Sequence, residues 1–164
     1  MYKTYISIRD ASINKVAKSD TIRNMDINLE IKEQVIGIEL AIKLKRLGTG
    51  AKQESYFVWH NSYFVWYKGE LMPRKDLPSS ADENDIFAAF TSQELGWMLP
   101  KVAECEGLKL YLGTDKDASD SEWAVWYENS DGTQWKDCYA STSSEAYSRG
   151  YVLAILLENS VVPE

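Results

Sequence analysis

The chain has few of the residues that build metal and catalytic centres. Its 164 residues include two cysteines and one histidine, which is too few for a cysteine ligand set or a histidine cluster. His60 falls in a predicted turn, where a solvated side chain is a better interpretation than a general base. The sequence also lacks the G-x-S-x-G, H-E-x-x-H and glycine-rich phosphate-loop motifs. We therefore expect a non-enzymatic protein with no metal and no cofactor, whose Cys105 and Cys138 are reduced thiols in a reducing compartment.

Long apolar runs and an excess of basic charge are also missing. The longest purely aliphatic run covers residues 152–157, and the N-terminal MYKTYISIRD lacks the apolar centre of a signal peptide. We expect a cytoplasmic protein that does not bind membranes. The net charge is −7, and residues 101–164 carry five Lys or Arg against twelve Asp or Glu. This acidity argues against nucleic acid as a partner, since phosphate contacts need a basic patch. It permits a basic partner, and it is equally typical of a surface that keeps a protein soluble.

The remaining composition is that of one folded domain. Hydrophobic residues make up 45% of the chain and aromatic residues 12%, enough for one core. Residues 1–27 indicate an N-terminal arm or edge strand, and residues 28–164 a single domain. Apolar residues at helical spacing predict a helix over residues 28–48. Two T-x-x-E words, at residues 91–94 and 142–145, match the capping box and predict helices over 91–100 and 142–158. The last helix is apolar on more than one side, so it is either the centre of the core or a homodimer contact.

The five-residue motif SYFVW occurs twice, at residues 55–59 and 62–66. It predicts two strands, 54–59 and 62–68, joined by a two-residue turn at His60 and Asn61 that pairs Ser55 with Trp66. Because strand faces alternate, Tyr56 and Tyr63 would then share an outward face with two valines, and both are candidate contact residues. The face toward the helices would carry Phe57, Trp59, Phe64 and Trp66. A three-residue loop would remove this segregation.

The second half of the chain predicts another hairpin. Residues 70–85 have loop composition, with an acidic helix start at 82–85, and further strands are expected at 108–112, 122–127 and 133–139 around the turn NSDG at 129–132. The order (β)αββ-αβββα predicts an α+β fold, in which an antiparallel meander-like sheet of aromatic hairpins carries three main helices on one face. The hairpin aromatics, including Trp123 and Trp135, form either core or a ligand groove, and in the second case these two tryptophans are candidate binding residues.

The acidic segment DKDASDSE at residues 115–122 begins like a calcium-binding EF-hand loop. It departs from that pattern because Asp120 replaces the required glycine and Trp126 replaces the bidentate glutamate. A solvated acidic loop is the better interpretation, with weak adventitious Ca²⁺ binding as the alternative. Convergence of Asp115, Asp117 and Glu122 in a cleft would instead favour a catalytic site.

Three segments together resemble a known group of proteins: IELAIKLKRLG at 38–48, AFTSQELGWMLP at 89–100 and LAILLEN at 153–159. They are similar to small phage and prophage proteins of unassigned function, over about residues 30 to 162. The resemblance implies a bacterial host cytoplasm and brings no catalytic or ligand residues with it. We expect a protein that binds another macromolecule, with an acidic inhibitor or mimic directed at a basic host protein as the sharper form. The alternative is a small-molecule-binding module with a Trp/Tyr-lined pocket.

Overall fold

The computed structural model describes residues 31–50, 62–117 and 119–163. The chain divides between Ile31 and Lys32 into two units, and all of these residues except Ile31 belong to the second. The predicted N-terminal arm and the first aromatic strand, residues 54–59, lie outside the described residues. Within them, helices combine with two antiparallel sheets, which confirms the predicted α+β class. None of the helices among these residues is both long and apolar enough to cross a membrane.

The larger sheet has five strands in the order β7-β6-β5-β4-β8, all antiparallel to their neighbours. Its strands are β4 (Val102–Cys105), β5 (Leu108–Lys116), β6 (Trp123–Glu128), β7 (Gln134–Thr142) and β8 (Val162–Pro163). The predicted turn at 129–132 joins β6 to β7, with the Asn129 side chain accepting from the Asp131 and Thr133 amides. Strands β4 and β8 were not predicted, because four-residue and two-residue segments are too short to show alternation.

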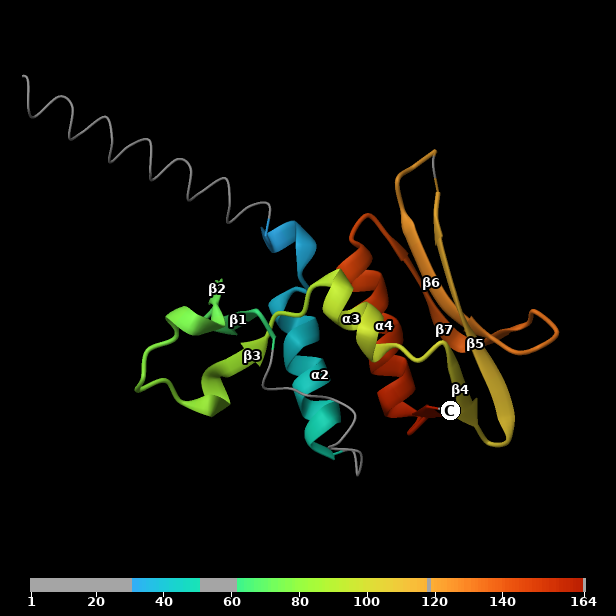
Figure 1. Cartoon of the computed structure of the whole chain (residues 1–164), viewed down its shortest axis with the longest axis horizontal. Coiled ribbons are helices and arrows are strands. Elements are labelled where there is room, and N and C mark those ends of the chain that lie inside the picture. The colour runs from blue at the N-terminus through green and yellow to red at the C-terminus, as the bar shows by residue number, and fades with distance from the viewer. Residues whose placement is uncertain (1–30, 51–61, 118, 164) are drawn as a thin grey trace, which may run out of the picture. The chain divides into compact units, whose positions relative to one another are not determined.

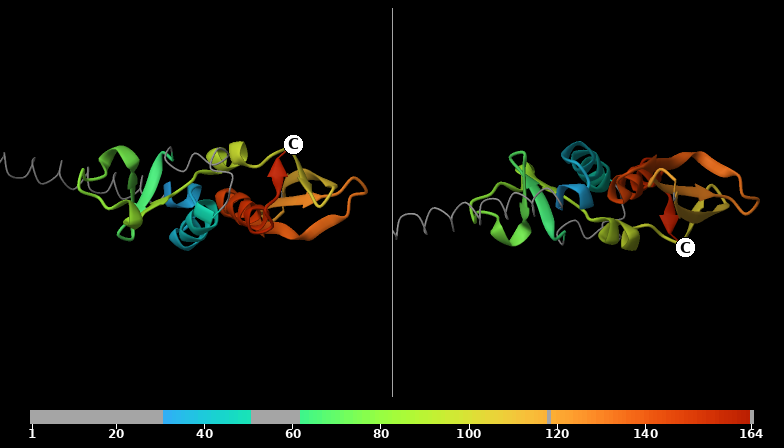
Figure 2. Two further views of the ribbon diagram at one scale, coloured as in Figure 1. Left: turned by 90° about the horizontal axis from the view of Figure 1, so that it is seen from below. Right: turned by 90° about the horizontal axis from the view of Figure 1, so that it is seen from above.

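One face of this sheet, the inner face, packs against α4 (Glu145–Glu158), which lies along β6 and β7 (Figure 1). Alternate residues supply this face, so that Leu110, Val125, Tyr127, Cys138 and Ala140 are all buried. Both cysteines of the chain are buried free thiols. Figures 1 and 2 place α2 (Ile38–Gly50), α3 (Ser92–Met98) and α4 on the same side of the sheet, as predicted. The opposite, outer face carries the groove described below.

The smaller sheet has the order β2-β1-β3, with β1 (Phe64–Tyr67) between β2 (Glu70–Pro73) and β3 (Ile86–Ala88). Trp66 therefore lies opposite Leu71 on one side and Phe87 on the other, and its predicted pairing with Ser55 is wrong. The cause is a closer turn: Lys68 and Gly69 both have positive φ, 50° and 82°, as a two-residue hairpin turn of the primed type requires. The loop-like composition of residues 70–85 gave no indication of this hairpin.

The predicted faces of β1 are also only partly correct. Val65, expected to face outward, is fully buried, while Trp66 packs against the core and donates its indole N–H to the Ile36 carbonyl over 2.9 Å. Tyr63, just before the strand, is 66% exposed. Burial of β1 is therefore mixed, with Val65 fully buried and the other three residues of the strand partly buried.

Helix α4 is the centre of the core. All of its residues from Val152 to Leu156 are buried, and both α2 and α3 pack against it. A Cβ at Gly150 would lie 2.9 Å from Ile36 Cγ2 and 3.0 Å from Leu40 Cδ2, so the glycine lets α2 approach the α4 backbone closely. In Figure 2 α4 lies between α2 and the five-stranded sheet. Of the two alternatives predicted for this helix, the centre of the core and a homodimer contact, the structure shows the first.

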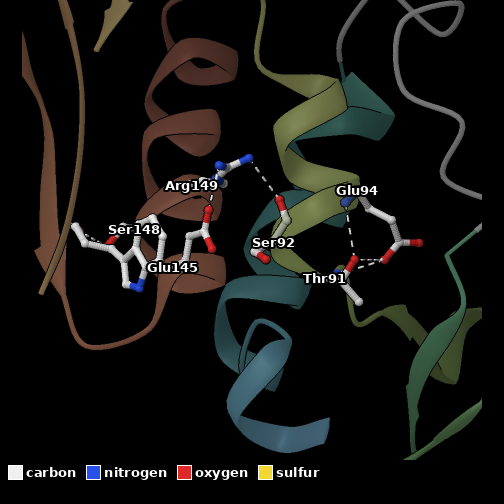
Figure 3. A network of polar contacts seen from close by, with 7 residues as sticks. Thr91, Ser92, Glu94, Glu145, Ser148 and Arg149 are labelled. Atoms are coloured by element: carbon white, nitrogen blue, oxygen red, sulfur yellow. Dashed lines mark hydrogen bonds and ion pairs between the residues drawn. The ribbon is translucent and has the colours of Figure 1, made fainter. Parts of the chain in front are cut away.

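The first of the two predicted capping boxes is confirmed. Thr91 Oγ1 accepts from the Glu94 amide over 3.2 Å, and Glu94 Oε2 accepts from the Thr91 amide over 2.8 Å (Figure 3). The second is wrong: Thr142 is the last residue of β7, and the cap of α4 is Ser144, whose Oγ accepts from the Tyr147 amide. A T-x-x-E word also occurs at a strand end, where the threonine favours extended backbone.

Two other predicted helices differ from the structure. The helix predicted over 28–48 is broken, because Val35 pairs with Thr91 and the Ile36 amide donates to the Phe90 carbonyl. Residues 31–34 are helical, and α2 then begins at Ile38. The helix predicted from residue 82 is one 3₁₀ turn, η3 (Glu83–Asp85), capped by Asp82 and followed directly by β3. In both places extended pairing with another segment of the chain replaced the helix.

Candidate functional site

The outer face of the five-stranded sheet has a regular pattern of side chains set by strand register. One row across the sheet contains Gly113 of β5, Trp126 of β6 and Tyr139 of β7. The next row contains Asp115, Ala124 and Ser141. Two of these six positions hold rings and three hold very small side chains, so the face is raised at Trp126 and Tyr139 and low at Ala124.

The Trp126 indole covers the glycine beside it. A Cβ built at Gly113 would lie 2.2 Å from Trp126 Cε2 and 2.5 Å from Cζ2, so ring atoms occupy the space that a side chain would need. The indole N–H donates to Glu128 Oε2 over 2.9 Å, which fixes the ring in its plane and satisfies its one polar atom within the protein. Trp126 is thus an oriented aromatic platform on the sheet.

A groove of about 660 Å³ runs over this platform. Its lining comes from the outer face, from the β6–β7 turn and from the β5–β6 connection. The lining residues are Asp115, Asp117, Asp120, Glu122, Ala124, Trp126, Glu128, Gly132, Gln134, Tyr139 and Ser141. Five of these eleven carry a carboxylate, and none is Lys, Arg or His. We call this surface the acidic groove.

Local hydrogen bonds hold several of the carboxylates in place. Asp117 Oδ1 accepts from both the hydroxyl and the amide of Ser119, over 2.6 and 2.7 Å, and these bonds hold the pKa of Asp117 below its usual value of 3.8. Glu122 Oε2 accepts from the Ser141 hydroxyl over 2.7 Å, which ties the loop to the edge strand β7. Asp117 therefore remains charged even in mildly acidic solution.

Nearby lysines are directed to the other face of the sheet. Lys116 lies opposite Trp123 in register, and its ammonium is 4.9 Å from the centre of that ring. Lys136 Nζ lies 4.8 Å from the Trp135 ring and donates to Asn159 Oδ1 over 2.8 Å. Neither ammonium belongs to the lining of the groove. The negative charge of the groove is accordingly not neutralised by the side chains that form it.

The three carboxylates noted in the sequence, Asp115, Asp117 and Glu122, do converge on one concave surface. A carboxyl acting as a general acid near pH 7 needs a raised pKa, whereas that of Asp117 is lowered. In residues 31–50, 62–117 and 119–163, no group of three or more His, Cys, Asp or Glu is placed to hold a metal ion. Charge attraction and aromatic stacking are the chemistry that this arrangement supports best.

The residues proposed from sequence are scattered. Tyr56 lies outside the described residues, and Tyr63 is exposed beside the smaller sheet rather than in the groove. Trp123 lies half buried on the inner face beneath Lys116. Trp135 is 7% exposed and belongs to the core, which was one of the two interpretations of the hairpin aromatics. The bulge between β6 and β7 turns Trp135 inward and Tyr139 outward.

Trp126 is the candidate residue that sequence reasoning missed. The sequence did carry one sign of it, the alternation of faces along a strand. Trp126 stands between Val125 and Tyr127, so it must lie on the face opposite the core if those two are buried. The presence of Gly113 in the neighbouring strand, which makes room for the ring, could be seen only once the register was known.

Comparison of the chain with protein-family models, with curated proteins and with solved structures finds no match. The residues of the acidic groove are therefore the basis for assigning a function.

Proposed function

We propose that the protein is a non-enzymatic phage or prophage-type protein that acts by binding another protein, and that the acidic groove holds a basic segment of that partner. One observation carries the proposal. The charged side chains that line the groove are all acidic, and they lie around two aromatic rings on the outer face of the five-stranded sheet. Tyr and Trp are enriched at protein interfaces, where they supply large contact areas at low entropy cost.

Charge would supply the selectivity and the speed of this binding. Each exposed ion pair contributes about 0.2 to 1 kcal/mol, so five carboxylates give moderate affinity that weakens as salt is added. The same charges attract a basic partner from a distance and repel acidic proteins and nucleic acids. The aromatic rings add a component that salt screens less.

The sharper form of the proposal is an acidic inhibitor or mimic that occupies a basic surface of a host protein. Support comes from the acidic net charge of −7 and from the three segments that resemble phage and prophage proteins. A basic, nucleic-acid-handling surface is the kind of target that such a groove would cover, because it presents Lys and Arg in an extended row.

The test is binding of a labelled basic peptide to the full chain, followed by fluorescence polarisation. The groove variant Asp115→Asn/Glu122→Gln removes two charges, and the matched control Glu104→Gln/Asp137→Asn removes two exposed carboxylates of the same sheet outside the groove. We expect the groove variant to bind about two- to thirtyfold more weakly, since two lost surface pairs correspond to about 0.4 to 2 kcal/mol, and the control to bind like wild type. Equal weakening by both variants would show that only net charge matters and would refute the groove.

A small-molecule-binding module is the second candidate, because Trp126 and Tyr139 would also suit a small organic cation in a groove of about 660 Å³. Native mass spectrometry of the protein purified from bacterial cells separates the two functions. A retained ligand of low mass that Trp126→Leu releases would favour the module, and an unliganded mass together with peptide binding would favour the protein partner.

A further inference from the structure

We propose that the acidic groove recognises arginine in preference to lysine, because Trp126 and the neighbouring carboxylates form a seat for a planar guanidinium group. This inference rests on the proposed function, and it adds the side chain that the groove selects. It depends on the orientation of one ring and on what lies beside it.

The ring offers a ligand its π face rather than its polar edge. One side of the indole rests on the backbone of Gly113, and its N–H is already bound to Glu128. Trp126 nevertheless lines the groove and is only partly buried, so the surface left for a ligand is aromatic carbon. The groups that gain most from such a surface are flat ones and cationic ones, and a guanidinium is both.

Space and charge beside the ring fit the rest of an arginine head group. The next row of the sheet has Ala124 between Asp115 and Ser141, so only a methyl group fills the floor next to Trp126. Ser141 in turn holds Glu122, whose carboxylate lines the same part of the groove. A guanidinium stacked on the indole could direct its in-plane N–H groups to these carboxylates, which accept two parallel hydrogen bonds.

Lysine cannot use the same arrangement as fully. Its ammonium is a compact, strongly hydrated charge that can lie over a ring or pair with a carboxylate but has no plane to stack. A simple acidic surface without an oriented ring would accept both side chains about equally. Preference for arginine therefore distinguishes this seat from general electrostatic attraction.

The experiment compares end-blocked octa-arginine with end-blocked octa-lysine on the full-length protein, at several salt concentrations. We expect octa-arginine to bind wild type about five- to tenfold more tightly, as a stacking gain of about one cation–π interaction gives. Trp126→Leu should bring the two affinities within about twofold of each other, while Trp97→Leu, which removes a 68% exposed tryptophan from α3, should leave the preference intact.

Each outcome decides between the two proposals. Equal binding of both peptides to wild type, or an arginine preference that survives Trp126→Leu, would overturn the guanidinium seat and leave the basic-partner groove standing. Binding of neither peptide would overturn the proposed function as well. If Trp126→Leu fails to fold, Ala124→Leu replaces it, because leucine fills the floor beside Trp126 without altering any charge. This variant should reduce the arginine preference, and an unchanged preference would overturn the guanidinium seat.

Discussion

Substitution of Gly96 by alanine tests how α3 and α4 are joined. Gly96 lies in α3 opposite Arg149 of α4, and a Cβ at this position would be 1.9 Å from Arg149 Nη1. The guanidinium bridges the helices, because Nη1 donates to the Ser92 carbonyl over 3.2 Å and Nη2 pairs with Glu145 over 2.6 Å (Figure 3). Alanine at position 96 must therefore move the arginine and break this bridge.

The expected size of the effect follows from the lost and gained interactions. A hydrogen bond from a charged donor contributes about 1.5 to 3 kcal/mol, and the ion pair, with both side chains 23% exposed, contributes at most about 1 kcal/mol. Alanine is about 1 kcal/mol better than glycine within a helix. Gly96→Ala should therefore lower the free energy of unfolding by about 2 kcal/mol.

A double-mutant cycle makes this prediction decisive. Arg149→Met retains most of the aliphatic stem and removes the group that meets the new Cβ. In that background Gly96→Ala should stabilise the protein by up to about 1 kcal/mol, so the sign of its effect reverses. Urea denaturation followed by circular dichroism measures all four proteins. A stabilising Gly96→Ala in the wild type, or the same effect in both backgrounds, would refute the proposed bridge.

Three further predictions concern single groups. Burial raises the pKa of the Cys138 thiol to about 12, so the native protein should resist thiol reagents at this position. The free energy of unfolding should fall as the pH rises from the unfolded pKa of 9.0 to about 12, because the unfolded state ionises first. Hydrogen bonds from Thr133 hold the pKa of the Asp131 carboxyl below its ordinary value of 3.8. The charged carboxylate therefore stabilises the folded protein above pH 3.8, and this stabilisation is lost as the pH falls through the lower pKa of the folded state. Carboxyl NMR titration should show the lowered pKa, and Thr133→Val should bring it closer to 3.8. Thr91→Ala should cost about 1 to 2 kcal/mol in chemical denaturation by removing the α3 cap, whereas Thr91→Ser, which retains the hydroxyl, should cost less than half as much.

Local signals in the sequence predicted the elements whose stabilising contacts are themselves local. The α3 box closes within three residues of Thr91, and the β6–β7 turn closes around Asn129, so both were found. The helix predicted over 28–48 failed for the opposite reason. Its break is caused by pairing of Val35 with Thr91, fifty-six positions away in the chain, and nothing near Val35 in the sequence reports that contact.

The candidate site shows the same limit. The acidic stretch at 115–122 and the aromatic hairpin were both visible in the sequence, but which ring faces the acids depends on register. The bulge between Trp126 and Glu128 decides that Tyr139 shares a face with Trp126 and that Trp135 does not. Without that bulge Trp135 and Tyr139, four positions apart on one strand, would lie on the same face of the sheet.

The position of α4 at the centre of the core has a consequence for synthesis on the ribosome. Strands β6 and β7 and helices α2 and α3 all emerge before Glu145–Glu158, yet each of them packs against that helix. Until α4 has been made, the nascent chain must expose the apolar face formed by residues such as Val125 and Tyr127. The domain should therefore complete its core only after α4 has left the ribosome, and growing chains that stop before Glu145 are expected to depend on chaperones or to be degraded.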